Sequence, residues 1–118
     1  MHWKDLEIWK KSHALVLKIY ELSGVFPKHE TYSLTDQIRR AATSVPANIV
    51  EGQSRNTTKE YRQFLYNAQG SLEEVRYFLL LSKDLGYADN AVYQSLEGDS
   101  ETLSKMLNGL IKSLTAKL

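Results

Sequence analysis

The stretch Leu34–Gly52, LTDQIRRAATSVPANIVEG, decides the predicted fold of this chain. Its apolar residues recur three and four positions apart, a spacing that places side chains on one face of an α-helix. This face consists of Leu34, Ile38, Ala41, Ala42, Val45 and Ile49. The alanines allow another helix to approach closely. The stretch therefore predicts a helix that packs tightly against neighbouring helices.

Pro46 lies inside this predicted helix, where proline removes one backbone hydrogen bond and strains the preceding turn. Two outcomes stay open: the helix kinks at Pro46, or it breaks and restarts with Ser44 as a cap. We favour the kink because the apolar face keeps its phase across the proline. Ser33 with Asp36 is expected to start the helix, and Gly52 is expected to end it in a left-handed conformation.

The rest of the chain predicts three more amphipathic helices, at about residues 5–25, at 58–85 and from about 90 nearly to the C-terminus. Each has a capping residue at its expected start: Asp5, Thr57 with Glu60, and Asp89 or Asn90. Gly86 is expected to stop the third helix. Four helices with short connections predict an all-α, antiparallel up-down-up-down four-helix bundle, with the second helix kinked at Pro46. The whole chain, residues 1–118, forms one predicted domain.

Two of the predicted helices carry more apolar side chains than one bundle needs. In the first helix, two apolar stripes lie on nearly opposite sides, because an α-helix turns by about 100° per residue. A spare stripe indicates a second subunit, although a monomer that surrounds this helix stays an alternative. The candidate oligomer-interface residues are Ile8, Leu15, Ile19, Leu22, Tyr66, Tyr77 and Leu81. Gly70, in the middle of the third helix, costs about 1 kcal/mol relative to alanine, a cost that is tolerable if another backbone comes close there.

Basic side chains gather on the second helix and around the start of the third. The candidate nucleic-acid-binding residues are Arg39, Arg40, Arg55, Lys59 and Arg62. Such side chains can bind phosphates through charge-assisted hydrogen bonds. The alternative is a solvated surface on which these arginines pair with Asp36, Glu51 and Glu60. Because the formal net charge is only +1, a nucleic-acid site would have to be local.

The chain lacks the patterns of common enzyme and metal sites. It has no Glu-x-x-His pair, no cysteine, no glycine-rich phosphate loop and no nucleophile elbow. The three histidines do not have the spacing of a metal site, and His13 is expected to be a hydrogen-bonded packing residue. We therefore predict a protein that is not an enzyme and that binds no metal or cofactor.

Composition and segment lengths are typical of a water-soluble domain. Hydrophobic residues make up 42% of the chain and charged residues 25%. The longest apolar run, Tyr77–Leu81, is far too short for a membrane-spanning helix. The N-terminal residues include charges where a secretion signal would have an unbroken apolar segment. A cytoplasmic protein without a membrane span is expected.

Five segments carry a resemblance to a known family: LEIWKKS (6–12), FPKHETY (26–32), QIRRAATSVPANIVEG (37–52), GSLEE (70–74) and LGY (85–87). Over about Trp3 to Tyr87, the chain resembles the small bacterial four-helix-bundle proteins encoded in intervening sequences of 23S ribosomal RNA genes. The accessory proteins of diversity-generating retroelements share that fold. Two departures are Val50, where alanine is expected, and Trp3, where a smaller aromatic residue is usual. Neither changes the predicted fold.

The resemblance implies a homopentamer of such bundles. For the ribosomal RNA branch of the family, RNA binding is the usual supposition. For the retroelement branch, the implied role is a scaffold that binds a reverse transcriptase and nucleic acid, and the near-neutral charge of this chain argues against it. We therefore predict a non-enzymatic, oligomeric helical-bundle protein that binds RNA, with a scaffold for another protein as the alternative.

Overall fold

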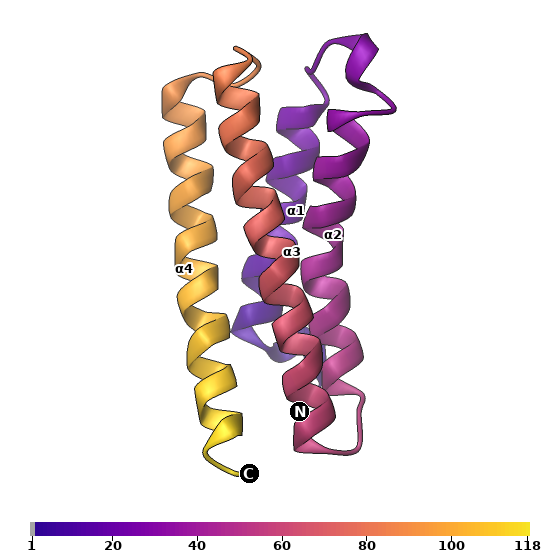
Figure 1. The fold of residues 1–118 in the computed structure, drawn as a ribbon, viewed down its shortest axis with the longest axis vertical. Coiled ribbons are helices and arrows are strands. Elements are labelled where there is room, and N and C mark those ends of the chain that lie inside the picture. The colour runs from indigo at the N-terminus through magenta and orange to yellow at the C-terminus, as the bar shows by residue number, and fades with distance from the viewer. Residues whose placement is uncertain (1) are drawn as a thin grey trace.

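The computed structural model describes residues 2–118. It contains four long helices: α1 (Glu7–Ser23), α2 (Leu34–Gln53), α3 (Thr58–Asp84) and α4 (Asn90–Thr115). Figure 1 shows them side by side, alternating in direction, in a bundle that measures 46 × 24 × 21 Å. Each helix packs against the next one in sequence, and α4 packs back against α1. The predicted all-α, up-down four-helix bundle is confirmed. Among residues 2–118, no helix is long and apolar enough to cross a membrane.

The apolar faces of all four helices meet in one core. Every residue of the predicted α2 face is buried, as are the α3 core residues from Leu65 to Leu79. On α1, however, the buried side chains include Ile8, Leu15 and Ile19. These three were predicted to face another subunit, and that prediction is wrong because the chain's own α2 and α4 cover them.

The chain enters α1 differently from the prediction. Trp3–Asp5 form a short 3-10 turn, η1, and α1 starts only at Glu7, so Asp5 is not its cap. The rings of Trp3 and Trp9 meet edge to face with centroids 4.9 Å apart, which holds the turn against the helix. His13 is exposed and stacks on Trp9 at 5.0 Å, so it packs on the surface of the bundle.

α2 continues without a break through Pro46. The alternative of a helix that restarts at Ser44 is therefore wrong, and the kink stays a prediction. The carbonyl and hydroxyl oxygens of Ser44 accept hydrogen bonds from Asn48 Nδ2 at 2.8 and 3.0 Å. Ser44 Oγ also accepts from Ser71 Oγ at 2.9 Å. These bonds satisfy polar groups beside the proline and connect α2 to α3.

Gly52 does not end α2 in a left-handed conformation, because it lies inside the helix and is buried. A Cβ atom at this position would lie 2.8 Å from Tyr61 Cδ1 and 2.9 Å from Phe64 Cβ. Real Cβ contacts are longer than this. The missing side chain therefore lets the first turns of α3 pack directly against the end of α2.

The start of α2 is capped from the preceding connection. Ser33 makes no capping hydrogen bond, whereas the Leu34 N–H donates to Glu30 Oε1 at 3.5 Å. Glu30 belongs to a second 3-10 turn, η2 (Lys28–Glu30), and its other carboxylate oxygen accepts from the Tyr87 hydroxyl at 2.8 Å. The α1–α2 and α3–α4 connections are thus joined at the upper end of the bundle in Figure 1.

The predicted starts of α3 and α4 are confirmed. Thr57 Oγ1 accepts from the Glu60 N–H at 3.1 Å, and an Asp89 carboxylate oxygen accepts from the Val92 N–H at 2.8 Å. Gly86, with a φ of 81°, follows α3 in the left-handed region. Local sequence signals therefore place these helix ends correctly.

Candidate nucleic-acid interface

The five predicted nucleic-acid-binding residues do not form one cluster. Arg39 and Arg40 lie near the start of α2, whereas Arg55 follows its end and Lys59 and Arg62 begin α3. With a rise of 1.5 Å per residue, the two groups are roughly 20 Å apart along the bundle. The five residues therefore lie at two separate places on the bundle.

Arg39 has a structural role within the chain. Its Nε donates to Ser23 Oγ at 2.8 Å and an Nη donates to the Tyr20 carbonyl at 3.4 Å. Its guanidinium also lies over the Tyr20 ring, 4.5 Å from the centroid. These contacts satisfy acceptors in the last turn of α1 and fix α2 to it. Two of the five N–H donors of Arg39 are thus used within the chain, and its guanidinium is held against α1.

Two arginines form the ion pairs that the solvated-surface alternative predicts. Arg40 Nε lies 2.8 Å from Asp36 Oδ2, and an Arg55 Nη lies 2.9 Å from Glu51 Oε2. In each pair the two residues are four positions apart in the sequence. Arg55 also lies over the Phe64 ring at 4.6 Å. Both pairs are largely exposed to solvent, so they cost little to open when a phosphate competes.

The remaining two residues lie where α3 begins. Lys59 is exposed. An Arg62 Nη donates to Thr115 Oγ1 at 3.3 Å, which connects α3 to the last turn of α4, and its guanidinium lies 5.9 Å from the centroid of the Tyr66 ring. Arg62 thus brings positive charge to the seam between α3 and α4.

Charge is segregated along the bundle. The half that holds both termini and the α2–α3 connection, at the lower end in Figure 1, comprises residues 2–15, 44–71 and 103–118. We call it the basic half, because it carries nine Lys and Arg against four Asp and Glu, a formal net charge of +5. The opposite, acidic half carries six against ten, a net charge of −4. The overall charge of +1 conceals this polarity.

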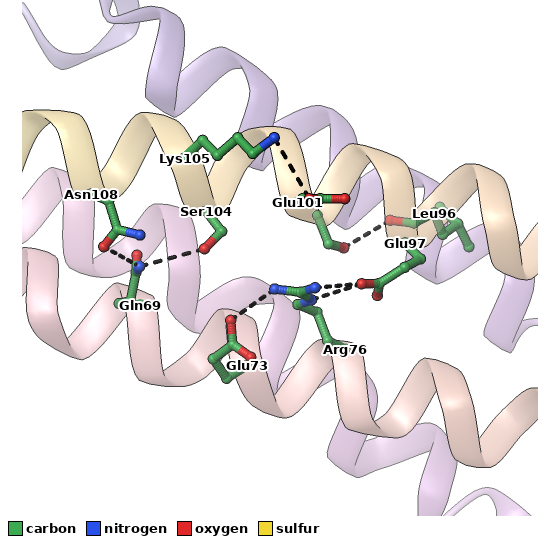
Figure 2. A network of polar contacts seen from close by, with 10 residues as sticks. Gln69, Glu73, Arg76, Leu96, Glu97, Glu101, Ser104, Lys105 and Asn108 are labelled. Atoms are coloured by element: carbon green, nitrogen blue, oxygen red, sulfur yellow. Dashed lines mark hydrogen bonds and ion pairs between the residues drawn. The ribbon is translucent and has the colours of Figure 1, made fainter.

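Figure 2 shows a polar network between α3 and α4 that was not predicted from the sequence. Arg76 Nε donates to Glu97 Oε1 at 3.0 Å, and an Arg76 Nη bonds Glu73 at 3.1 Å. The hydrogen bond with Glu97 raises the pKa of Arg76 above its ordinary value. Further along the seam, Gln69 Nε2 donates to Asn108 Oδ1 at 2.7 Å. Gln69 and Arg76 are seven positions apart and lie beside the apolar stripe of α3. This spacing could have indicated that both side chains face a neighbouring helix.

The other predicted interface residues are spread over several surfaces. Tyr66 and Tyr77 are 48% and 59% exposed on α3, whereas Leu81 is partly buried against the core. Leu22 lines a groove of about 530 Å³ between α1 and α4, together with Val25 and Val92. For these four residues the interface assignment stays a prediction.

Comparisons with known proteins agree with the resemblance found in the sequence. No curated protein matches the chain. A crystal structure from Bacteroides thetaiotaomicron VPI-5482, described as a protein of unknown function from the S23 ribosomal protein family, is similar with a TM-score of 0.83 and 26% sequence identity. The match covers 89% of this chain and 98% of that one. The family model of the 23S rRNA-intervening sequence proteins matches residues 4–109. The chain therefore belongs to the 23S rRNA-intervening sequence protein family.

Proposed function

We propose that this protein binds RNA through its basic half. The observation that carries the proposal is the charge segregation along the bundle, +5 against −4. A local excess of Lys and Arg attracts the phosphate backbone and releases counterions when it binds. Ribosomal RNA is the natural first RNA to test because the family is described by its relation to 23S rRNA.

The residues that support this proposal are the basic side chains with little internal engagement. Lys59, Lys112 and Lys117 are exposed, and the exposed Arg55–Glu51 pair can open toward solvent. Arg39 is left out because it is held by the last turn of α1. Arg40 is left out because it lies in the acidic half.

Charge reversal at matched positions tests the proposal. Lys59→Glu with Lys117→Glu alters the basic half, and Lys28→Glu with Lys83→Glu makes the same change in net charge in the acidic half. Binding to a folded 23S rRNA fragment is measured by fluorescence anisotropy over a range of salt concentrations. The first variant should bind at least tenfold more weakly, with a salt slope reduced by about 0.7–0.9 per lost phosphate contact. The control variant should change far less.

Two results would contradict RNA binding by the basic half. The first is wild-type protein that shows no salt-dependent binding to any RNA tested. The second is an equal loss of affinity in both variants, since that would reflect net charge alone. Unfolding curves of both variants establish that the bundle is intact.

We also infer that the chains self-associate through the outer face of α3. Tyr77 and Leu80 are 59% and 40% exposed there. Gly70 lies on the same face at heptad spacing from Tyr77, and a Cβ atom built on it meets no atom within 4 Å. No part of residues 2–118 packs closely on Gly70, which leaves room there for the backbone of a second copy. The family resemblance implies a pentamer, so light scattering should give five chain masses.

A monomer mass would favour the alternative function. The exposed apolar side chains on α3 would then be free for a different polypeptide, as in a scaffold protein. In that case the RNA-binding experiment above separates the two functions, because a scaffold without an RNA role shows no salt-dependent RNA binding.

A further inference from the structure

A second groove follows the seam between α3 and α4 inside the basic half. It is open to solvent, and its volume is about 520 Å³. The residues that line it are Tyr66, Asn108, Ile111, Lys112, Thr115 and Ala116. No Asp or Glu is among these described lining residues, and one of them is a lysine. The groove therefore combines an aromatic ring, an amide and positive charge.

The aromatic ring in this groove is held in place and remains accessible. Tyr66 is 48% exposed, and the guanidinium of Arg62 lies 5.9 Å from its ring centroid. Arg62 is itself held by Thr115 Oγ1, whose own hydroxyl donates to the Ile111 carbonyl at 2.8 Å. Tyr66 is thus an exposed stacking surface with a cation beside it, the combination that binds unpaired bases.

The orientation of the amide is set from inside the seam. Asn108 Oδ1 accepts from Gln69 Nε2, as Figure 2 shows, and Asn108 also lines the groove. Gln69 is further positioned by a 3.5 Å contact of the same nitrogen with Ser104 Oγ. The Asn108 NH₂ group is therefore left as a donor on the groove wall, where it can meet the oxygen and nitrogen acceptors of a base edge.

We propose that this α3–α4 groove takes one or two unpaired nucleotides of an RNA strand. The base stacks on Tyr66, and the Asn108 amide donates a hydrogen bond to the edge of the base. Lys112 and Arg62 bind the adjoining phosphates. A paired base cannot enter, because its faces and edge are occupied within the duplex. This inference rests on the RNA binding proposed above, and it adds a specific site and a preference for single strands. It assigns Tyr66 to RNA and not to the subunit interface, which on α3 is then limited to the face at Tyr77 and Leu80.

The principal test uses a short unstructured RNA oligonucleotide and the variant Tyr66→Leu, which keeps an apolar side chain but removes the ring. Stacking of one base is worth a factor of about 5–150 in affinity, so the variant should bind more weakly within that range. Its salt slope should stay unchanged because no charge is lost. The matched control is Tyr93→Leu, since Tyr93 also has a cation, Lys83, over its ring at 4.9 Å but lies in the acidic half.

A second variant keeps the inference testable if Tyr66→Leu fails to fold. Asn108→Asp retains the oxygen that accepts from Gln69 and replaces the outward amide donors with a carboxylate. Its control is Asn67→Asp, because Asn67 Oδ1 accepts from Gln63 Nε2 at 3.2 Å in the same basic half without lining the groove. The expected result is at least a tenfold greater loss of affinity for Asn108→Asp than for its control.

The outcomes separate this inference from the general RNA-binding proposal. If RNA still binds but Tyr66→Leu and Asn108→Asp behave like their controls, the groove assignment is overturned and the basic-half proposal stands. A blunt-ended RNA duplex that competes as well as the single strand also overturns it, since phosphates alone then explain binding. If wild-type protein binds no RNA, the proposed function fails first. Weaker competition by single-stranded DNA of the same sequence supports a contact to the ribose hydroxyl.

Discussion

At Gly52 the first turns of α3 pack directly against α2, and replacing this residue gives a direct measure of that packing. In Gly52→Ala the new Cβ atom must displace Tyr61 and Phe64, which lie within 3 Å of its position. We expect a loss of about 1–3 kcal/mol in the free energy of unfolding, as for other overpacked sites. Urea denaturation followed by circular dichroism measures this change.

Gly109→Ala provides the control, because no atom lies within 4 Å of a Cβ built at Gly109 in α4. This substitution should raise the free energy of unfolding by about 0.5–1 kcal/mol through helix propensity alone. If Gly52→Ala were as stable as the control variant, the close approach of α2 and α3 at this point would be wrong.

Tyr87 acts between elements, since its hydroxyl joins the α3–α4 connection to the 3-10 turn that caps α2. The hydrogen bond to Glu30 is the main cause that raises the pKa of Tyr87 above its ordinary value near 10, and burial and the carboxylate charge add to it. A phenol whose pKa is higher in the folded state contributes its full stability below about pH 10 and loses it as pH rises through the folded pKa.

The wild type should therefore lose more stability than Tyr87→Phe as pH rises above about 10. Urea denaturation at a series of pH values from 8 upward measures this on both proteins. Partly buried Tyr61, whose pKa is also raised by burial, is common to both. Stability curves that stay parallel through this range would show that the Tyr87–Glu30 bond does not couple to folding.

The accuracy of the sequence analysis at the scale of elements depended on how local each signal was. The apolar face of α2 repeats within one helix. The side chains of Thr57 and Asp89 each accept from the backbone N–H three residues later, so these features could be predicted. The ion pairs of Arg40 and Arg55 span four residues and were likewise predicted. Gly52 was misassigned because glycine serves equally in a left-handed turn and in a close helix contact.

Features that join distant parts of the chain were beyond the sequence analysis. The partners of Arg39 and Arg62 lie on other helices, 16 and 53 residues away. On α1, two stripes had similar periodicity, and only the positions of α2 and α4 decide which one is buried. The same limit explains why the interface prediction failed for Ile8, Leu15 and Ile19.

At the scale of the whole molecule, the alternation of helix direction determines where charge collects. Three segments with individual net charges of +1, +1 and +3 meet at one end because successive helices run in opposite directions along the bundle. In a ring of parallel-oriented copies these basic halves would lie on one face. Each RNA would then meet several equivalent sites, and binding to the second would be intramolecular.

This arrangement predicts that self-association and RNA affinity are coupled. Tyr77→Asp with Leu80→Asp places two charges on the outer face of α3 and should reduce the mass measured by light scattering to that of a single chain. Long RNA should then bind at least tenfold more weakly, because avidity is lost, while the intrinsic affinity of a short oligonucleotide for each chain stays unchanged. The control Val25→Asp with Tyr32→Asp adds the same charges at positions 77% and 96% exposed outside α3 and should alter neither quantity.

An unchanged mass in the α3 variant would show that the subunits do not meet at this face. A dissociated variant that keeps full affinity for long RNA would show that each chain binds RNA independently, and the charge polarity of the single bundle would then suffice.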